Sequence, residues 1–435
     1  MIMLIVFRAL SGIGGGGIIT SAMIVVTDVV SLEKRGAYQG FIGMVVSFAN
    51  ALGPLIGGIF TEKVSWRWCF SQYINIPLTS VALVVAVFAL PLKPVTVCKK
   101  LQFKQIDYLG CTAMLLSAVL ILLPISWGGT QYAWNSAAVI APLVIGIVSL
   151  GVFILVEIKI AALPLIPMHI FKIPTVAGAS TVSFFSGFMF YANLYYLPQF
   201  FQVILSASPI KSGVLLLPLI VIQSIVSFTS GFIVSKTGNY TINLRVGFII
   251  WTIACGLLST INPNTSIAKL VGYQILSGVG SGQTFQTALI AIQAGVKTNE
   301  MAVATSTRNF VLQTELSSVI SVSALKAIVA DPTQISSTSL GLTGSQKSAA
   351  IQAYTHGIRN IYYFMVACCF ISFLLSVYPV RGQSLKREDD AKRQEEGKQW
   401  AVKNKGIIGI RGKKNPESSP KKIEEGLTEV TKPKT

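Results

Sequence analysis

Charge, histidine and closely paired cysteine are all scarce in this chain. Asp, Glu, Lys and Arg make up 12% of its 435 residues, against about 25% in a typical soluble protein. So few charged side chains cannot cover the surface of a soluble protein of this length, which excludes that class. The two histidines, His169 and His356, stand far apart, so a metal centre or a Ser-His-Asp arrangement has almost nothing to build on. We therefore expect no enzyme, no cofactor and no metal site.

The six cysteines form no C-x-x-C pair, and most of them sit in apolar runs. In such surroundings cysteine is usually a small buried hydrophobic residue rather than a metal ligand or a disulfide partner. The formal charge of +18 is spread over loops and a basic tail, a pattern typical of the cytoplasmic side of a membrane protein. No nucleic-acid partner is expected from it.

Apolar sequence is what the chain has in abundance, with 52% hydrophobic residues. Runs of about 18 or more apolar residues recur, and each is long enough to cross a bilayer as a helix. We therefore predict an all-α polytopic membrane protein with about eleven transmembrane helices. The predicted spans are residues 2–27, 37–60, 73–91, 108–125, 137–156, 175–200, 212–235, 244–261, 268–294, 304–328 and 360–379.

Loop charge predicts the orientation of these spans. One set of alternate loops, which includes Lys34, Arg35 and Lys99, carries about twice as many Lys and Arg as the other set, and such loops face the cytoplasm. The basic tail, 381–435, falls on the same side and is expected to be disordered, because it is polar and highly charged. An odd number of spans then leaves Met1 outside.

The stretch "RALSGIGGGGII" near the start has glycines at 12, 14 and 17 that fit G-x-G-x-x-G, the fingerprint of a dinucleotide site. That fingerprint needs a strand before it, a helix after it and an acidic residue about 20 positions on. Here the flanks form one apolar span, and the nearest acid, Asp28, comes too early. We therefore predict that Gly12, Gly14 and Gly16 let neighbouring helices approach closely.

A second stretch of similar sequence indicates an internal repeat and thus a duplicated architecture. "FRALSGIGGGG" at 7–17 and "YQILSGVGSGQ" at 273–283 match at five of eleven positions. Many transporters are built from such repeats, placed around a central site.

Three ionisable residues within or at the ends of spans are candidate functional residues, because a charge at membrane depth is costly. Arg8 faces a polar cavity or snorkels to the near interface. Glu315 is near the middle of its span, where it is a proton carrier or a structural partner of Arg308. Asp28 closes the first span, where an interfacial salt bridge or gate contact competes with a proton site.

The second span carries "ANALGPLIGGIF", in which Ala49, Gly53 and Gly57 fall on one face. Pro54 interrupts the backbone hydrogen bonds between them, and Gly58 adds a further small residue. We expect this stripe to form a close, bent helix contact.

These motifs resemble the Major Facilitator Superfamily, in the fourteen-helix drug–proton antiporter branch that includes fungal toxin-efflux pumps. "LIVFRALSGIGGGG" is similar to the family's fourth-helix motif, whose arginine is implicated in proton coupling, which implies that role for Arg8. "ALGPLIGG" is similar to the antiporter motif of the fifth helix, although Ala49 stands where that motif usually has glycine. "DVVSLEKRGAYQG" and "VSWRWCF" also read like that branch.

The resemblance covers residues 1 to about 380 and implies the major facilitator fold. It also implies that the family's first three helices, with their loop motif, are absent from this chain, and only "GFIVSKTGNY" resembles that motif. The expected domains are a partial N-terminal half of three helices at 1–91, a two-helix central insert at 92–172 and a six-helix C-terminal half at 173–380. The tail at 381–435 follows.

Two spans supply candidate cavity residues. In the sixth, four aromatic residues share a face near the polar Asn193, an arrangement that suits flat apolar compounds, cationic or neutral, but also plain packing. In the ninth, three glutamines and Thr287 at helical spacing predict an inward-facing polar stripe, whose contact with substrate stays open. The candidates are Phe184, Phe188, Tyr191, Asn193, Tyr195, Gln283, Gln286 and Gln293.

The resemblance implies proton-coupled export of small amphipathic compounds by alternating access, with protons and the small-molecule substrate as partners. We expect a monomer in the plasma membrane. Two alternatives stay open: a siderophore or basic amino-acid transporter, and a truncated remnant that does not transport.

Overall fold

The computed structural model describes residues 2–30, 32–63, 75–89, 107–129, 131–161, 164–296 and 344–382. Within these ranges the chain forms helices joined by turns and short loops, and its only extended pairing is one isolated bridge between Gly128 and Tyr132. The helices are α1 (Ile2–Val29), α2 (Leu32–Lys63), α4 (Asn75–Ala89), α6 (Tyr108–Trp127), α7 (Ala137–Lys159), η1 (Met168–Lys172), α8 (Pro174–Gln199), η2 (Phe200–Ile204), α9 (Pro209–Thr237), α10 (Tyr240–Leu258), α11 (Ile267–Gly295) and α13 (Gly344–Val377).

Ten of the eleven predicted spans coincide with these helices, and the prediction of an all-helical membrane protein is confirmed. Among the described helices, six are apolar and long enough to cross a membrane: α1, α6, α7, α9, α10 and α13. The others include α2, α8 and α11, whose buried faces carry glycine, serine, asparagine and glutamine. The predicted span 304–328 lies outside the described residues.

The last helix begins earlier than predicted, at Gly344 rather than near residue 360. The added segment, "GSQKSAAIQAYTHGIR", is too polar for a hydropathy search to detect. It is nevertheless rich in alanine and glutamine, which favour helix. Hydropathy therefore marks the apolar part of α13 and misses its polar beginning.

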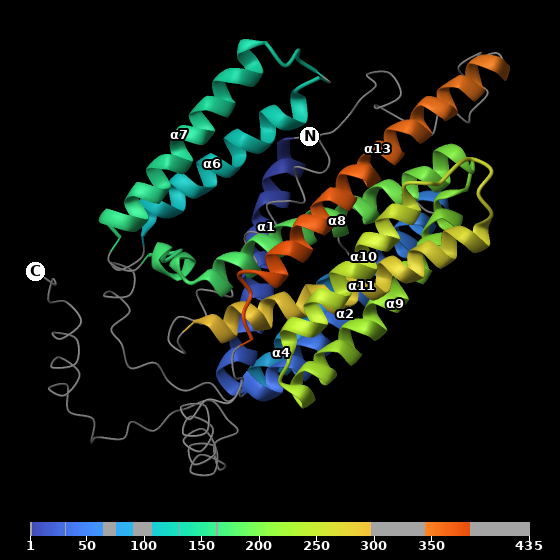
Figure 1. Ribbon diagram of the computed structural model, residues 1–435. Helices are drawn as coiled ribbons and strands as arrows, with labels where there is room; N and C mark the ends of the chain where they lie inside the picture. Colours follow the sequence, from blue (N-terminus) through green and yellow to red (C-terminus); the bar gives the residue numbers. More distant parts are fainter. Residues whose placement is uncertain are drawn as a thin grey trace, which may run out of the picture.

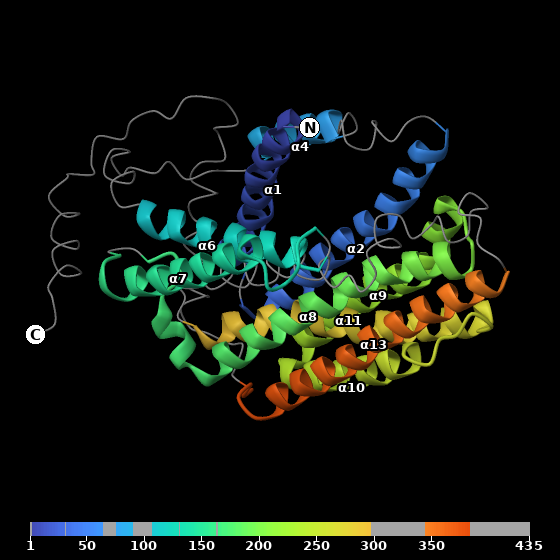
Figure 2. The same cartoon turned by 90° about the horizontal axis from the view of Figure 1, so that it is seen from above.

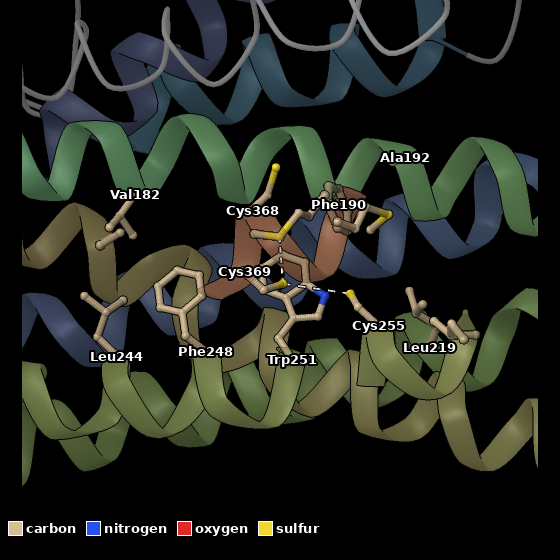
Figure 3. Packing of buried hydrophobic residues seen from close by; sticks show 14 of the residues in the cluster. Val182, Phe190, Ala192, Leu219, Leu244, Phe248, Trp251, Cys255, Cys368 and Cys369 are labelled. Carbon is tan, nitrogen blue, oxygen red and sulfur yellow. Dashed lines mark hydrogen bonds between the residues drawn. The ribbon is translucent and has the colours of Figure 1, made fainter. Parts of the chain in front are cut away.

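The elements from α8 onward pack side by side with α2, which runs along α9 and α11 (Figure 1). Their shared core contains Trp251 and Phe248 of α10, whose rings stack with centroids 6.3 Å apart. Figure 3 shows Cys369 of α13 reaching toward Cys255 and Trp251 of α10. The two sulfur atoms lie 3.9 Å apart. Cys255, Cys368 and Cys369 are buried, as predicted for small core residues, whereas Cys111 is half-buried. Cys69 and Cys98 lie outside the described residues.

α6 and α7 form an antiparallel pair (Figures 1 and 2). Asp107 caps the start of α6, where its Oδ1 accepts a hydrogen bond from the Gly110 N–H at 2.8 Å. A small apolar cluster of Ala113, Phe153 and Ile166 joins the pair to η1, because side chains of η1 pack against it. The pair is thus tied to the start of α8 by local contacts.

Candidate functional site

The closest helix contact in the described chain lies between α2 and α9. A Cβ atom placed on Gly36 would lie 2.6 Å from the Gly231 carbonyl oxygen, and one on Gly40 would lie 2.8 Å from the Ser227 carbonyl oxygen. On the other side, a Cβ on Gly231 would collide with the Gly36 carbonyl oxygen and reach within 2.9 Å of the Gly40 Cα. Real side chains do not fit at such distances, so glycine is required where the two backbones meet.

The sequence interpretation did not select these glycines. Gly36, Gly40 and Gly43 follow small-residue spacing as regularly as the stripe at Ala49, Gly53 and Gly57 does. Such spacing marks a face that can pack closely, but it does not name the partner helix.

The antiporter-motif stripe has room for larger side chains at two of its glycines. No described atom lies within 4 Å of a Cβ placed on Gly53 or Gly57, and Ala49 is exposed. The surroundings of Pro54 and Gly58 lie outside the described residues. A contact of this stripe with another helix stays a prediction.

The glycine run of α1 likewise has open space around it. No described atom lies within 4 Å of a Cβ placed on Gly12, Gly14 or Gly16. Their role in helix packing stays a prediction.

The three predicted proton-coupling residues are only partly located. Arg8 and Asp28 belong to α1, but their side chains are outside the described residues. Glu315 and its alternative partner Arg308 lie outside them altogether. The structure therefore leaves these roles untested.

The aromatic residues of α8 share a face, as their spacing predicts. Phe184 and Tyr195 are exposed, while Phe188 and Tyr191 are half-buried. Phe188 makes an edge-on contact with Phe364 of α13, with ring centroids 5.5 Å apart. This face therefore borders α13, and contact with a substrate stays a prediction.

Asn193 lies on the buried side of α8 rather than with these aromatics, and is 2% exposed. Its Oδ1 accepts a hydrogen bond from the Tyr362 hydroxyl at 3.1 Å, and its Nδ2 donates to the Met189 carbonyl at 3.1 Å. One turn and a half further on, the Tyr354 hydroxyl donates to Gln199 Oε1 at 2.7 Å. These polar pairs hold α8 against α13. Just past Gln199, α8 continues into the π-turn η2.

The three glutamines of α11 do not form one stripe. A Cβ placed on Gly247 of α10 would lie 3.3 Å from Gln283 Oε1, so Gln283 faces α10. A Cβ on Gly43 of α2 would lie 3.0 Å from Gln286 Nε2, so Gln286 faces α2. Gln293 is fully buried further along the helix. The residues are polar and mostly buried, as predicted, but they point to different helices.

A hydrogen-bond network joins α9, α10 and α11 beside Gln283. Asn243 Nδ2 donates to Ser230 Oγ at 2.5 Å, to Thr287 Oγ1 at 2.9 Å and to the Gln283 carbonyl at 3.3 Å. Because the bilayer offers no water to replace such bonds, internal polar networks of this kind fix helix orientation. The sequence interpretation included Gln283 and Thr287. It omitted Asn243, which is the last residue of a predicted loop, just before the span predicted at 244–261.

Comparison with known proteins gives the family context of these helices. The Major Facilitator Superfamily profile matches residues 1–322. The efflux pump dotC of Dothistroma septosporum is 39% identical over 309 residues, covering 71% of this chain and 53% of that protein. The MFS-type transporter ppz2 of Metarhizium majus is 43% identical over 310 residues, covering 71% and 53%.

The efflux pump FUS6 of Gibberella fujikuroi is 33% identical over 407 residues, covering 88% of this chain and 73% of that protein. The chain spans about half the length of the first two of these relatives. The profile match covers well over half of the chain, and the described helices agree with it. The chain is a multi-pass membrane protein that belongs to the Major Facilitator Superfamily.

Proposed function

We propose that this chain serves in the proton-coupled export of small amphipathic compounds, by alternating access across the plasma membrane. The observation that carries the proposal is the α2–α9 contact, in which glycine backbones meet while a polar cluster lies beside them. Two helices that meet through glycine have no interdigitated side chains at their contact. They can therefore move apart without changes in side-chain conformation. The relatives dotC and FUS6, which are named as efflux pumps, support the same conclusion.

In this proposal Arg8 couples the movement of protons to export, with Glu315 and Asp28 as further candidate proton sites. The substrate would meet the cavity residues of α8 and α11. The transporter is proposed to act as a monomer, with its C-terminal tail in the cytoplasm.

The test measures uptake of probe compounds into proteoliposomes that contain the purified chain and whose interior is loaded with buffer at acidic pH. Hydrocortisone and tetraphenylphosphonium serve as an uncharged and a cationic amphipathic probe. We expect the probes to accumulate above the level found in protein-free liposomes, and we expect a protonophore to abolish this accumulation. Accumulation equal to that of protein-free liposomes would contradict the proposal.

Arg8→Ala should abolish gradient-driven accumulation while leaving membrane insertion intact, because removing a cation eases burial in the bilayer. Arg8→Lys should retain part of the activity, since both side chains carry the positive charge. Normal transport by the Ala variant would assign Arg8 to the membrane interface instead.

A further inference from the structure

Four polar side chains at the meeting point of α2, α9 and α11 are buried with unpartnered atoms. They are Gln39, with both amide atoms unpartnered, Gln223 and Gln286, with their Oε1 atoms, and Ser227, with its Oγ. Their exposed fractions are 0%, 3%, 5% and 3%, respectively. A buried polar group without a hydrogen-bond partner is unfavourable, so four such side chains in one place call for a partner outside the helices themselves.

The backbone contacts bring these four residues together. A Cβ placed on Gly282 of α11 would lie 2.8 Å from the Gln223 carbonyl oxygen and 3.1 Å from the Ser227 amide nitrogen. Gln286 follows Gly282 by one helical turn, and Ser227 follows Gln223 by one turn. α9 and α11 therefore present these three side chains to the same region.

α2 closes that region from the other side. A Cβ on Gly43 would collide with Ser227 Oγ and lie 2.9 Å from Gln286 Cγ. Gln39 precedes Gly43 by one turn and shares its face. We refer to Gln39, Gln223, Ser227 and Gln286 as the amide site.

No carboxylate of the described chain is buried near the amide site. The buried charged side chains in the described ranges are Arg35 and Glu157, and Glu157 belongs to the α6–α7 pair. Arg35 is one turn from Gln39, and its Nε donates to the Val30 carbonyl at 2.9 Å. Among the described residues, a cation at the amide site would meet no carboxylate and would lie near the buried Arg35 guanidinium, which disfavours it relative to an uncharged group.

We propose that the amide site binds the polar group of an uncharged substrate that carries hydroxyl or carbonyl groups. This inference rests on the proposed export function and assigns the chemical class of its substrate. Three of the unpartnered atoms are amide oxygens, which accept, while Gln39 Nε2 and the Ser227 hydroxyl can donate. A hydroxyl group can therefore pair with any of them, and a carbonyl group can accept from the two donors. The site has one wall on α2 and the other on α9 and α11, so movement of α2 away from α9 opens it to a ligand.

The test is equilibrium binding to the purified chain in lipid nanodiscs. The uncharged probes are tritiated hydrocortisone and cycloheximide, and the cationic probe is tetraphenylphosphonium. We expect the uncharged probes to bind, and Gln39→Leu and Gln286→Leu to weaken their binding about tenfold, because a site built on hydrogen bonds discriminates strongly when they are lost. Gln202→Leu is the matched control. Gln202 lies in η2, where its Nε2 donates to Ser212 Oγ at 3.3 Å, and the change should leave Kd within about twofold.

A second variant keeps the test decisive if a Leu variant does not fold. Gln286→Glu places a carboxylate in the site and should raise affinity for tetraphenylphosphonium relative to hydrocortisone. The proposal is overturned if the parent chain prefers the cation, if it binds neither class, or if the Gln variants bind both classes as the parent does. Binding that follows the expected pattern without gradient-driven uptake would refute the export function and support the amide site.

Discussion

Glu157 and Arg35 are the charged side chains that the described residues bury, and each acts on backbone groups at a helix end. Arg35 donates to the carbonyl of Val30, just past the end of α1. The Glu157 carboxylate accepts hydrogen bonds from the Leu165 and Ile166 N–H groups at 3.1 Å and 3.2 Å. Because helix ends and turns leave backbone groups without internal partners, a charged side chain can satisfy them and fix the direction of the chain.

Glu157→Ala should loosen the connection from α7 to η1, because it leaves two backbone N–H groups without acceptors. The expected cost is about 1–3 kcal/mol, and Glu157→Gln should cost less, since one acceptor oxygen remains. Hydrogen exchange at the Leu165 and Ile166 amides measures the effect. Exchange in the Ala variant at the parent rate would show that other contacts hold this connection.

At the scale of the element, α2 divides into two parts that differ in their surroundings. Its first turns pack on α9 through Gly36 and Gly40, whereas Gly53 and Gly57 have no described atom within 4 Å of a Cβ. Figure 2 shows α2 diverging from the bundle toward its C-terminal end. One helix therefore carries a glycine face that packs tightly against α9 and a second one at which a Cβ would meet no described atom.

Gly40→Val should destabilise the α2–α9 contact, because its side chain would meet the Ser227 and Phe228 carbonyl oxygens, which lie 2.8 Å and 3.0 Å from a Cβ on Gly40. Overpacking of this kind typically costs about 1–3 kcal/mol or more. Thermal unfolding of the purified protein in detergent measures it. Gly53→Val is the control and should unfold at the same temperature as the parent protein. If both variants lowered the unfolding temperature equally, the effect would come from placing valine anywhere in this helix and not from the α2–α9 contact.

Gly57→Val should reduce export or uncouple it from protons while folding is largely kept. No described atom lies within 4 Å of a Cβ on Gly57, and we expect the stripe to make its close contact in another conformation of the transport cycle, where a larger side chain would hold the helices apart. Ile59→Val, at a position that is 43% exposed, is the matched control and should be silent. The measurement is probe uptake and proton leak in proteoliposomes. If both variants behave alike, the antiporter motif has only an ordinary packing role.

At the scale of the whole molecule, the distribution of charge predicts how the chain sits in the membrane. Residues 381–435 carry fifteen Lys and Arg and nine Asp and Glu, and basic segments that follow the last span are retained in the cytoplasm. The first residue of this tail contacts the bundle, because the Tyr240 hydroxyl of α10 donates to the Arg381 carbonyl at 2.6 Å. The end of α13 and the start of α10 therefore share one face of the bundle.

A cysteine introduced in the tail, such as Ser384→Cys, should react with an impermeant maleimide only after cells are permeabilised. A cysteine at Asn264, in the loop between α10 and α11, should react in intact cells, because alternate loops lie on opposite sides. Labelling of the tail from outside intact cells would reverse the orientation.

The sequence by itself determined the class, the family and most of the helices. Length and hydropathy are properties of each segment taken alone, and a bilayer requires a helix wherever an apolar run crosses it. For the same reason the polar start of α13 was missed, since residues 344–359 carry helix propensity without hydropathy. The motifs at Arg8 and at Ala49–Gly58 were sufficient for the family assignment, which the profile match confirms.

Only the tertiary structure decided which faces meet. Small-residue spacing occurs twice along α2, and the sequence offers no reason to pair Gly36 and Gly40, rather than Gly53 and Gly57, with Gly231. Likewise Gln283 and Gln286 are three positions apart, yet they point to α10 and to α2, respectively. Periodicity assigns a residue to a face of its own helix, whereas the neighbour of that face depends on how several helices cross, which no single segment encodes.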